Sequence, residues 1–178
     1  MTSPLPALDV GCGLNKRPGA IGIDRNPRTA ADVLADIDRG SLPFLDATAS
    51  SISLVHVIEH LRSVVGALEE CHRVLRPGGR LLIETPHCSD ASSFADPTHR
   101  WHLNSFSLRY FTEPSGYGYY SPCRFRLVSL EVKLLRLWRI LGVEFGVNRS
   151  RAIRKFWEYY LCWVIRGKAL VFELEAIK

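Results

Sequence analysis

The segment from Ile52 to Glu84 constrains the fold of this chain more than any other part of the sequence. An apolar run at residues 52–57 precedes apolar residues at helical spacing, namely Val64, Ala67, Leu68, Cys71, Val74 and Leu75. Pro77-Gly78-Gly79 then stops the predicted helix, and a second apolar run covers residues 80–84. A strand, a helix and a strand in this order make a right-handed crossover between parallel strands. We therefore expect a parallel sheet.

Further apolar runs extend this sheet on both sides. Three precede the segment, at residues 7–10, 20–23 and 31–35, and each ends at a glycine or an aspartate. Two follow it, at residues 124–135 and 169–177, and a short helix is expected at 104–111. Short apolar runs without clean alternation, closed by turn residues, are typical of strands buried on both faces. We expect both faces of the sheet to be covered.

A helix with several aromatic residues is predicted between the last two strands. Ser150 is its expected N-cap, the helix is expected to run to Arg166, and Gly167 is its expected C-cap. Its apolar stripe consists of Ile153, Phe156, Trp157, Tyr160, Leu161, Val164 and Ile165. Helical spacing favours packing of most of these side chains in the core. The alternative is a surface that contacts a membrane, because Arg151, Arg154 and Lys155 lie among the aromatics.

Composition limits the possible partners and compartments. The net charge is +5, and much of the excess lies in the last third of the chain. This indicates either a solvated face or an anionic partner, and no RNA-binding signature is present, so nucleic acid is not expected. The five cysteines form no CxxC pair, and neither a signal peptide nor an apolar stretch of membrane-spanning length is visible. We expect a cytoplasmic protein without disulfides.

A glycine turn follows the first strand and an acidic residue ends the second. Gly11 and Gly13 lack a Cβ atom, so their backbone allows close approach of a ligand. The carboxylate of Asp24 can accept hydrogen bonds from the two hydroxyls of a ribose. Together these features indicate a nucleoside-containing ligand.

The spacing favours S-adenosylmethionine over a dinucleotide. A dinucleotide site needs a third glycine and a helix whose N-terminus holds the pyrophosphate. Here Asn15 and Lys16 follow the turn, and Asp24 comes eleven positions after Gly13, which leaves no room for a crossover helix. S-adenosylmethionine has no phosphate, and Lys16 or Arg17 could pair with its carboxylate. An NAD-dependent reductase is the more distant alternative.

The chain resembles class I methyltransferases, most closely the methyltransferase-11-like group. The motifs LDVGCGLN, IGIDRNP, ADI, LPFLD, HVIEHL and CHRVLRPGGRLLIETPH occur in the family's order over residues 7–111, and FELEAIK resembles a last strand of small members. The resemblance implies a Rossmann-like, mostly parallel α/β sheet with an antiparallel last strand, here with a shortened first crossover. No repeats, low-complexity segments or linker are visible, so we expect a single domain over 1–178, with a cofactor-binding half at 1–87 and an acceptor-side and C-terminal half at 88–178.

The resemblance assigns roles residue by residue. Its cofactor is S-adenosylmethionine, with Asp9, Gly11 and Gly13 at the methionine end and Asp24 on the ribose. Asp36 and the backbone of Ile37 would meet the adenine, His56 would lie beside the cofactor, and Glu59 and His60 could orient the site. The chain departs from the family at Asn15, in place of the usual third glycine, and lacks an N-terminal helix. A second subunit or the aromatic helix could cover the exposed sheet.

The acceptor is expected to face residues that follow the fifth strand, because ligands of open α/β sheets bind beyond the carboxyl ends of strands. Asp96-Pro97-Thr98-His99-Arg100 resembles a stretch of small methyltransferases encoded near glycan-assembly enzymes. His99 with Asp96 is the first candidate for a base, and His87 is the second. The histidines and Cys88 match no common zinc spacing, so no metal is expected.

The sequence thus predicts an S-adenosylmethionine-dependent methyltransferase that acts on a small-molecule or glycan acceptor. One alternative is a catalytically degenerate module that binds the cofactor and acts through a partner. The other is a module that acts at a membrane surface. A homodimer is compatible with each of these hypotheses.

Overall fold

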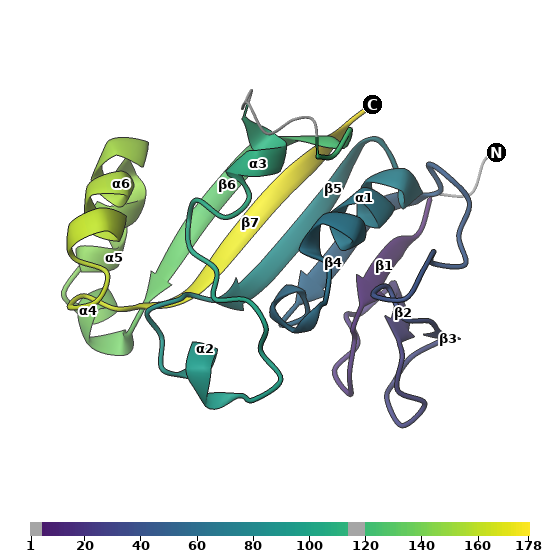
Figure 1. Cartoon of the computed structure of the whole chain (residues 1–178), viewed down its shortest axis with the longest axis horizontal. Coiled ribbons are helices and arrows are strands. Elements are labelled where there is room, and N and C mark those ends of the chain that lie inside the picture. Colours follow the sequence, from purple (N-terminus) through teal and green to yellow (C-terminus); the bar gives the residue numbers. More distant parts are fainter. Residues whose placement is uncertain (1–4, 114–119) are drawn as a thin grey trace.

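The computed structural model describes residues 5–113 and 120–178 of the chain. Its centre is a seven-stranded sheet in the order β3-β2-β1-β4-β5-β7-β6 (Figure 1). The strands are β1 (Ala7–Val10), β2 (Ala20–Asp24), β3 (Val33–Leu34), β4 (Ala49–Val55), β5 (Leu75–Pro86), β6 (Arg124–Leu134) and β7 (Gly167–Ile177). Strand β7 is antiparallel to its neighbours β5 and β6, while β3, β2, β1, β4 and β5 are parallel to one another. The predicted mostly parallel sheet with an antiparallel last strand is confirmed.

The predicted helix between β4 and β5 is α1 (Val64–Val74). It begins where the Ser63 hydroxyl accepts a hydrogen bond from the Gly66 N–H, as an N-cap does. Its buried residues are Ala67, Leu68, Cys71 and Val74, all on the predicted apolar face. Strand β5 begins at Leu75 rather than Arg80, because Leu75 already pairs with Ala49 before a bulge.

The first crossover is as short as the sequence predicts. Residues 11–19, between β1 and β2, form turns without a helix, and β2 reaches β3 through another short loop. The chain leaves β4 through a 3₁₀ turn, η1 (Ile58–His60), which leads directly into α1. The loops that follow β1, β2 and β4 therefore stay close to the sheet edge.

The two faces of the sheet differ, and the expectation of two buried faces is wrong. One face is apolar, carries α1 and α3 (Arg109–Thr112) in Figure 1, and contains Leu8, Val10, Ile52, Leu54, Leu81, Ile83, Phe172 and Leu174. Alternate residues on the other face are mostly polar, and Arg80 forms ion pairs there with Glu173 at 3.6 Å and Glu175 at 3.3 Å. Apolar and polar residues alternate with a period of two in β4, β5 and β7, and this pattern produces a sheet with one face exposed to solvent.

Short helices follow β5 and β6. They are α2 (Ser92–Ala95), α3, which is shorter than the predicted 104–111, α4 (Arg136–Ile140), α5 (Val143–Arg149) and α6 (Arg151–Tyr160). Ser150 caps α6 by accepting a hydrogen bond from the Ile153 N–H at 3.1 Å, as predicted. The helix ends at Tyr160 rather than Arg166, because the N–H groups of Leu161 and Cys162 both donate to the Trp157 carbonyl. Gly167 begins β7 instead of capping the helix.

The predicted burial of the aromatic stripe is also wrong. Trp157 alone of its aromatic residues is buried, and its indole N–H donates to the Ile165 carbonyl at 2.9 Å. Phe156 is 56% exposed and Tyr160 is 72% exposed. Figure 1 shows the reason, since α4–α6 stand at the end of the molecule beyond β6 rather than over the sheet.

Among the described residues, each helix is too short or too polar to cross a bilayer.

Candidate functional site

A cleft of about 280 Å³, partly open to solvent, lies at the carboxyl ends of β1, β2, β3 and β4. The short loops after these strands bring together residues that are far apart in the sequence. Its walls are Val10, Gly11, Asp24, Arg25, Ala35, Asp36, Ile37, His56, Val57, His60, Leu61 and Thr98. Five of the seven residues predicted to bind a cofactor are among them: Gly11, Asp24, Asp36, Ile37 and His56.

Gly11 forms a part of the wall that no other residue type could form. Its φ angle is +70°, and a Cβ atom there would lie 2.3 Å from Val57 Cγ2. Its N–H donates to the Ile23 carbonyl at 2.7 Å, which fixes the turn against β2. The cleft therefore meets bare backbone at this point.

The carboxylate of Asp24 is held in place by the turn that it closes. Its two oxygens accept hydrogen bonds from the Gly13 N–H at 3.0 Å and from the Asn26 N–H at 2.9 Å. Each carboxylate oxygen has a further lone pair, so the side chain can still accept hydrogen bonds from a ligand. Gly13 thus positions Asp24 and is not among the residues of the wall.

Asp36 occupies the same wall as Asp24, one strand further along. It accepts a hydrogen bond from the Asp38 N–H at 3.1 Å and pairs with Arg39 at 3.4 Å. Ile37 is buried beside it. Two carboxylates and an apolar surface therefore share one side of the cleft.

Two other predicted residues have structural partners instead. Asp9 is 4% exposed, and its oxygens accept hydrogen bonds from the Ser53 hydroxyl at 2.7 Å and the Arg17 N–H at 2.9 Å. It therefore holds the glycine loop from behind rather than lining the cleft. Lys16, considered as a partner for a ligand carboxylate, pairs with Asp32 at 2.8 Å.

His56 lies at the mouth of the cleft, with a φ angle of +55° that few side chains adopt. Its Nδ1 is 3.2 Å from Glu59 Oε1. That hydrogen bond, opposed in part by burial, raises the pKa of His56 above its ordinary value of 6.5. Glu59 is itself buried and accepts a second hydrogen bond from the Thr85 hydroxyl at 3.1 Å.

A hydrogen-bonded series of side chains reaches the opposite wall of the cleft. The Thr98 hydroxyl donates to Asp96 Oδ1 at 2.7 Å, so its oxygen can accept from His60 Nδ1, which lies 2.9 Å away. In neutral His60 this places the proton on Nδ1 and leaves the lone pair on Nε2. The same Thr98 hydroxyl holds the pKa of Asp96 below its usual range. An Asp–Thr–His series therefore presents an unprotonated imidazole nitrogen.

The structure changes the role expected for His99. Its ring packs edge-on against His60 at 4.6 Å, and its side chain is 7% exposed. Its Nδ1 donates to the Ser93 carbonyl at 3.0 Å, and its Nε2 is 3.8 Å from Asp96. His99 thus stands behind His60 rather than in the wall. The sequence placed Thr98 in the acceptor-side segment but did not predict its pairing with His60, because this contact spans 38 positions of the chain.

His87 lies outside the cleft walls and is completely buried. Its Nε2 is 2.9 Å from Glu158 Oε1, and its Nδ1 is 2.8 Å from the Ser89 hydroxyl. Burial raises the pKa of Glu158, but the hydrogen bonds and charge interaction with His87 and Ser105 together outweigh burial and leave the pKa lowered. The candidate base His87 is therefore enclosed by Ser89 of its own loop and Glu158 of α6, away from the cleft.

Two groups of side chains in the described residues lie close enough together to hold a metal ion. They are Glu59, His60 and His99, and His87, Cys88 and Glu158, with ligand atoms within 4.8 Å in each group. Hydrogen bonds already engage Glu59, His87 and Glu158. The expectation that the chain uses no metal stays a prediction.

Comparison with known families finds one match that includes the cleft. Residues 8–83 match the model of a methyltransferase domain. This region contains β1 through most of β5, and thus every cleft residue except Thr98.

Individual proteins give the same result. A probable S-adenosylmethionine-dependent methyltransferase of Mycolicibacterium smegmatis is 34% identical over 62% of this chain and 51% of its own length. A demethylmenaquinone methyltransferase of Tropheryma whipplei is 28% identical over 67% of this chain and 58% of its own length. The chain thus spans a little over half the length of these curated relatives.

The fold also matches solved structures. The crystal structure of an S-adenosylmethionine-dependent methyltransferase from Archaeoglobus fulgidus superposes with a TM-score of 0.63 and 17% identity. The match covers 96% of this chain and 85% of the other. The overall fold is therefore similar over nearly the whole of this chain.

Proposed function

We propose that the chain is a class I S-adenosylmethionine-dependent methyltransferase that transfers the methyl group of that cofactor to a small-molecule or glycan acceptor. The observation that carries the proposal is the pair of carboxylates, Asp24 and Asp36, on one wall of the cleft beside the bare backbone of Gly11.

The cleft residues fit an adenosyl ligand. Asp24 keeps free lone pairs that two vicinal ribose hydroxyls can use. Ile37 and Leu61 supply apolar surface for an adenine, and Asp36 supplies an acceptor at its edge. The volume of the cleft, about 280 Å³, is close to the lower end of the range of small-molecule sites.

A dinucleotide fits less well. Its pyrophosphate is held by the N-terminus of a helix that follows the glycine turn. Residues 11–19 contain turns only, and the two carboxylates of the wall would repel phosphate. These features support S-adenosylmethionine, which carries a positive charge and no phosphate.

When bound, the cofactor supplies a methyl group on a positively charged sulfur that becomes the leaving group. The protein's part is to position the acceptor in a dry site and to take its proton. We assign the second task to His60, because Thr98 and Asp96 hold its proton on Nδ1 and leave Nε2 free. In this proposal His60 takes the place of His99 as the base, and Asp96 supports it through Thr98.

The relatives favour a small molecule over a glycan. The protein of Tropheryma whipplei is named for methylation of demethylmenaquinone, a small molecule. Wall residues from the short loops leave the cleft partly open, which suits an acceptor that enters from solution or from a surface.

Calorimetry with S-adenosylhomocysteine tests the cofactor assignment. We expect binding to the wild-type chain and more than about tenfold weaker binding to Asp24→Ala, which corresponds to about 1.4 kcal/mol. Asp46→Ala is the matched control, because Asp46 is an exposed acid with a surface ion pair to Arg73. Equal affinity of the Asp24→Ala and wild-type chains would refute the assignment.

A transfer assay tests the proposed base. The chain is incubated with tritiated S-adenosylmethionine and fractionated cell extract, and labelled product is counted. His60→Ala should lose most of the label, by a factor of about 10² or more, while S-adenosylhomocysteine affinity changes little. His99→Ala should lose less. Binding of the cofactor without any labelled product would favour the degenerate module instead.

A further inference from the structure

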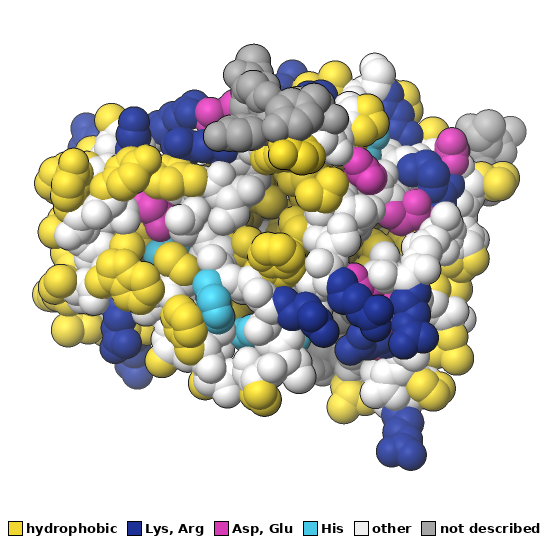
Figure 2. Space-filling model, in the orientation of Figure 1, with side chains coloured by type: hydrophobic (Ala, Val, Ile, Leu, Met, Phe, Trp, Pro, Cys, Tyr) yellow, Lys and Arg dark blue, Asp and Glu magenta, His cyan; other side chains and the backbone are white. Residues whose placement is uncertain are grey.

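The end of the molecule formed by α4, α5 and α6 exposes an unusual amount of apolar surface. Half of the large hydrophobic side chains that are exposed in the described residues, ten of twenty, lie between residues 136 and 166. On α4 and α5 they include Ile140, which is 70% exposed, and Phe145, which is 73% exposed. Figure 2 shows these side chains gathered at one end of the molecule. A soluble monomer rarely exposes a contiguous apolar patch without a function for it.

The exposed residues of α6 form a helical stripe that faces solvent. Ile153, Phe156 and Tyr160 recur at spacings of three and four, and Trp163 and Val164 continue beyond the helix end. Tyr160 and Trp163 have an apolar body and a polar tip, the combination enriched at membrane–water interfaces. The other side of the helix packs inward through Trp157.

The same segment is strongly basic. Residues 136–166 contain seven Arg or Lys and two Glu, and one of those, Glu158, is buried against His87. Basic side chains among exposed Trp, Tyr, Phe and Leu are typical of helices that lie on anionic membranes. Charge complementarity therefore selects an acidic surface as the occupant.

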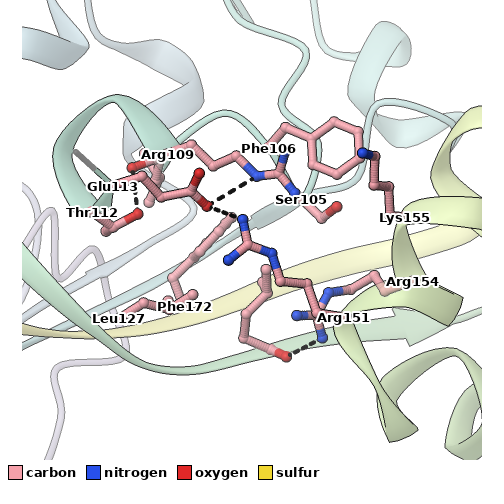
Figure 3. A pocket seen from close by; sticks show the side chains of 12 residues that line it. Ser105, Phe106, Arg109, Thr112, Glu113, Leu127, Arg151, Arg154, Lys155 and Phe172 are labelled. Atoms are coloured by element: carbon pink, nitrogen blue, oxygen red, sulfur yellow. Dashed lines mark hydrogen bonds and ion pairs between the residues drawn. The ribbon is translucent and has the colours of Figure 1, made fainter. Parts of the chain in front are cut away.

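A cavity beside this surface concentrates the positive charge further (Figure 3). It is lined by side chains that include Arg109, Arg151, Arg154 and Lys155. Glu113 is its one acidic lining residue, and it pairs with both Arg109 and Arg151. Arg154 is half-buried, and burial together with the nearby Arg151 lowers its pKa. An anion in the cavity would relieve this repulsion.

The cavity wall also carries a buried hydroxyl group, that of Ser105 (Figure 3). Arginine side chains, a lysine and a hydroxyl are the groups that bind phosphate oxygens.

Ring contacts connect the cavity to the apolar stripe. Phe106, which lines the cavity under the guanidinium of Arg109, packs against Tyr159 at 5.2 Å between ring centroids. Tyr159 is followed by Tyr160 at 6.3 Å, and Tyr160 by Phe156 at 5.1 Å. The basic cavity and the aromatic surface are thus one continuous region, with the cavity at its border.

We propose that this region, formed by α4–α6 and the basic cavity, docks the protein on membranes that contain anionic phospholipids, with a lipid phosphate held in the cavity. The apolar side chains of the three helices enter the boundary between headgroups and acyl chains. Lys155 and Arg151 contact phosphate oxygens at the headgroup level. The proposal does not depend on methyl transfer.

Vesicle co-sedimentation tests the proposal with the full chain. We expect binding to vesicles of equal phosphatidylglycerol and phosphatidylcholine, much weaker binding to phosphatidylcholine alone, and loss of binding as salt is raised. Phe156→Ser with Tyr160→Ser should weaken binding at least tenfold, and Lys155→Gln about fivefold. These side chains are exposed, so thermal melting should be nearly unchanged.

Matched controls use equivalent residues elsewhere. Leu45→Ser changes a leucine that is 78% exposed, and Arg76→Gln removes an exposed positive charge at the start of β5. Both should bind anionic vesicles like the wild type. If they weaken binding as much as the helix and cavity variants do, the assigned surface is wrong.

Two further measurements separate other occupants of the surface. The first is a calorimetric titration with inorganic phosphate. Tight binding of phosphate by a chain that does not bind vesicles would overturn the membrane assignment in favour of a free anion. Light scattering tests for a dimer of this chain. A dimer that does not bind vesicles and that Phe156→Ser with Tyr160→Ser dissociates would overturn the membrane assignment in favour of a second copy of this chain.

Discussion

The cleft and the buried pair His87–Glu158 use the same residue types for opposite purposes. In the cleft, Asp24 and Asp36 each accept hydrogen bonds from the backbone and still face an open space. In the buried pair, the side chain of Glu158 is 3% exposed and that of His87 is fully buried, and both have protein partners. A candidate site is therefore recognised by unused hydrogen-bonding capacity beside a cavity, and not by the presence of histidines and acids.

The largest expected effect comes from breaking the buried pair. Glu158→Ala leaves the His87 imidazole and the Ser105 N–H without their partner in a dry environment. We expect the free energy of unfolding to fall by about 3 kcal/mol or more, because removal of one member of a buried pair strands the other. Urea denaturation measures this change. S-adenosylhomocysteine affinity of the folded variant should stay within about twofold.

Acid titration sharpens the same prediction. The pKa of Glu158 is lowered from its ordinary 4.5, so the ionised carboxylate stabilises the fold above that value, and this contribution is lost as pH falls through the lowered pKa. Glu158→Gln should therefore flatten the decline in stability below about pH 4.5. Glu131→Gln, at an exposed ion pair with Lys133, serves as the control and should leave the decline unchanged.

A smaller effect is expected in the cleft, where a substitution should change ligand affinity rather than stability. Asp36→Ala should weaken binding of S-adenosylhomocysteine about fivefold, the equivalent of one hydrogen bond of about 1 kcal/mol. The free energy of unfolding should change by less than about 0.5 kcal/mol, because Asp36 is a partly exposed loop residue. Calorimetry and urea denaturation of the same sample measure both. A variant that loses stability but retains affinity would erase the distinction between the two regions.

The sequence predicted the strand tips well and the long loops poorly. Asp24, Asp36 and His56 each end or follow a strand, so the order of parallel strands was enough to bring them to one edge. The position of His60 against Thr98 depends instead on how residues 87–104 pack, and no local pattern encodes that. The burial of His87 has a similar long-range origin, because its ring packs on Gly167, where a Cβ atom would be 2.5 Å from His87 Cγ.

The same limit explains the error over the aromatic helix. Helical periodicity indicates that one side of α6 is apolar, but not whether that side meets protein or something else. The buried side is set by Trp157 and Arg154, which contact the Ile165 and Leu130 carbonyls, while Phe156 and Tyr160 face outward. Likewise, apolar runs in β4 and β5 concealed a period of two, since Ser51, Ser53 and Arg80 alternate with the core residues.

The smallest expected effect concerns His56, whose side chain lies between the two extremes at 55% exposed. Its pKa is raised from 6.5 chiefly by the hydrogen bond to Glu59, so its protonated form stabilises the fold. This contribution is complete below about pH 6.5 and is lost as pH rises through the raised pKa.

Glu59→Gln keeps the shape of the side chain but removes its charge, and should move the titration midpoint of the His56 Cε1 proton in NMR spectra back toward 6.5. Glu69→Gln on α1 is the control and should leave the midpoint where it is. An unchanged midpoint in Glu59→Gln would mean that the hydrogen bond with Glu59 does not hold His56 in solution. Of these three cleft side chains, only Asp24 and Asp36 would then be held by hydrogen bonds.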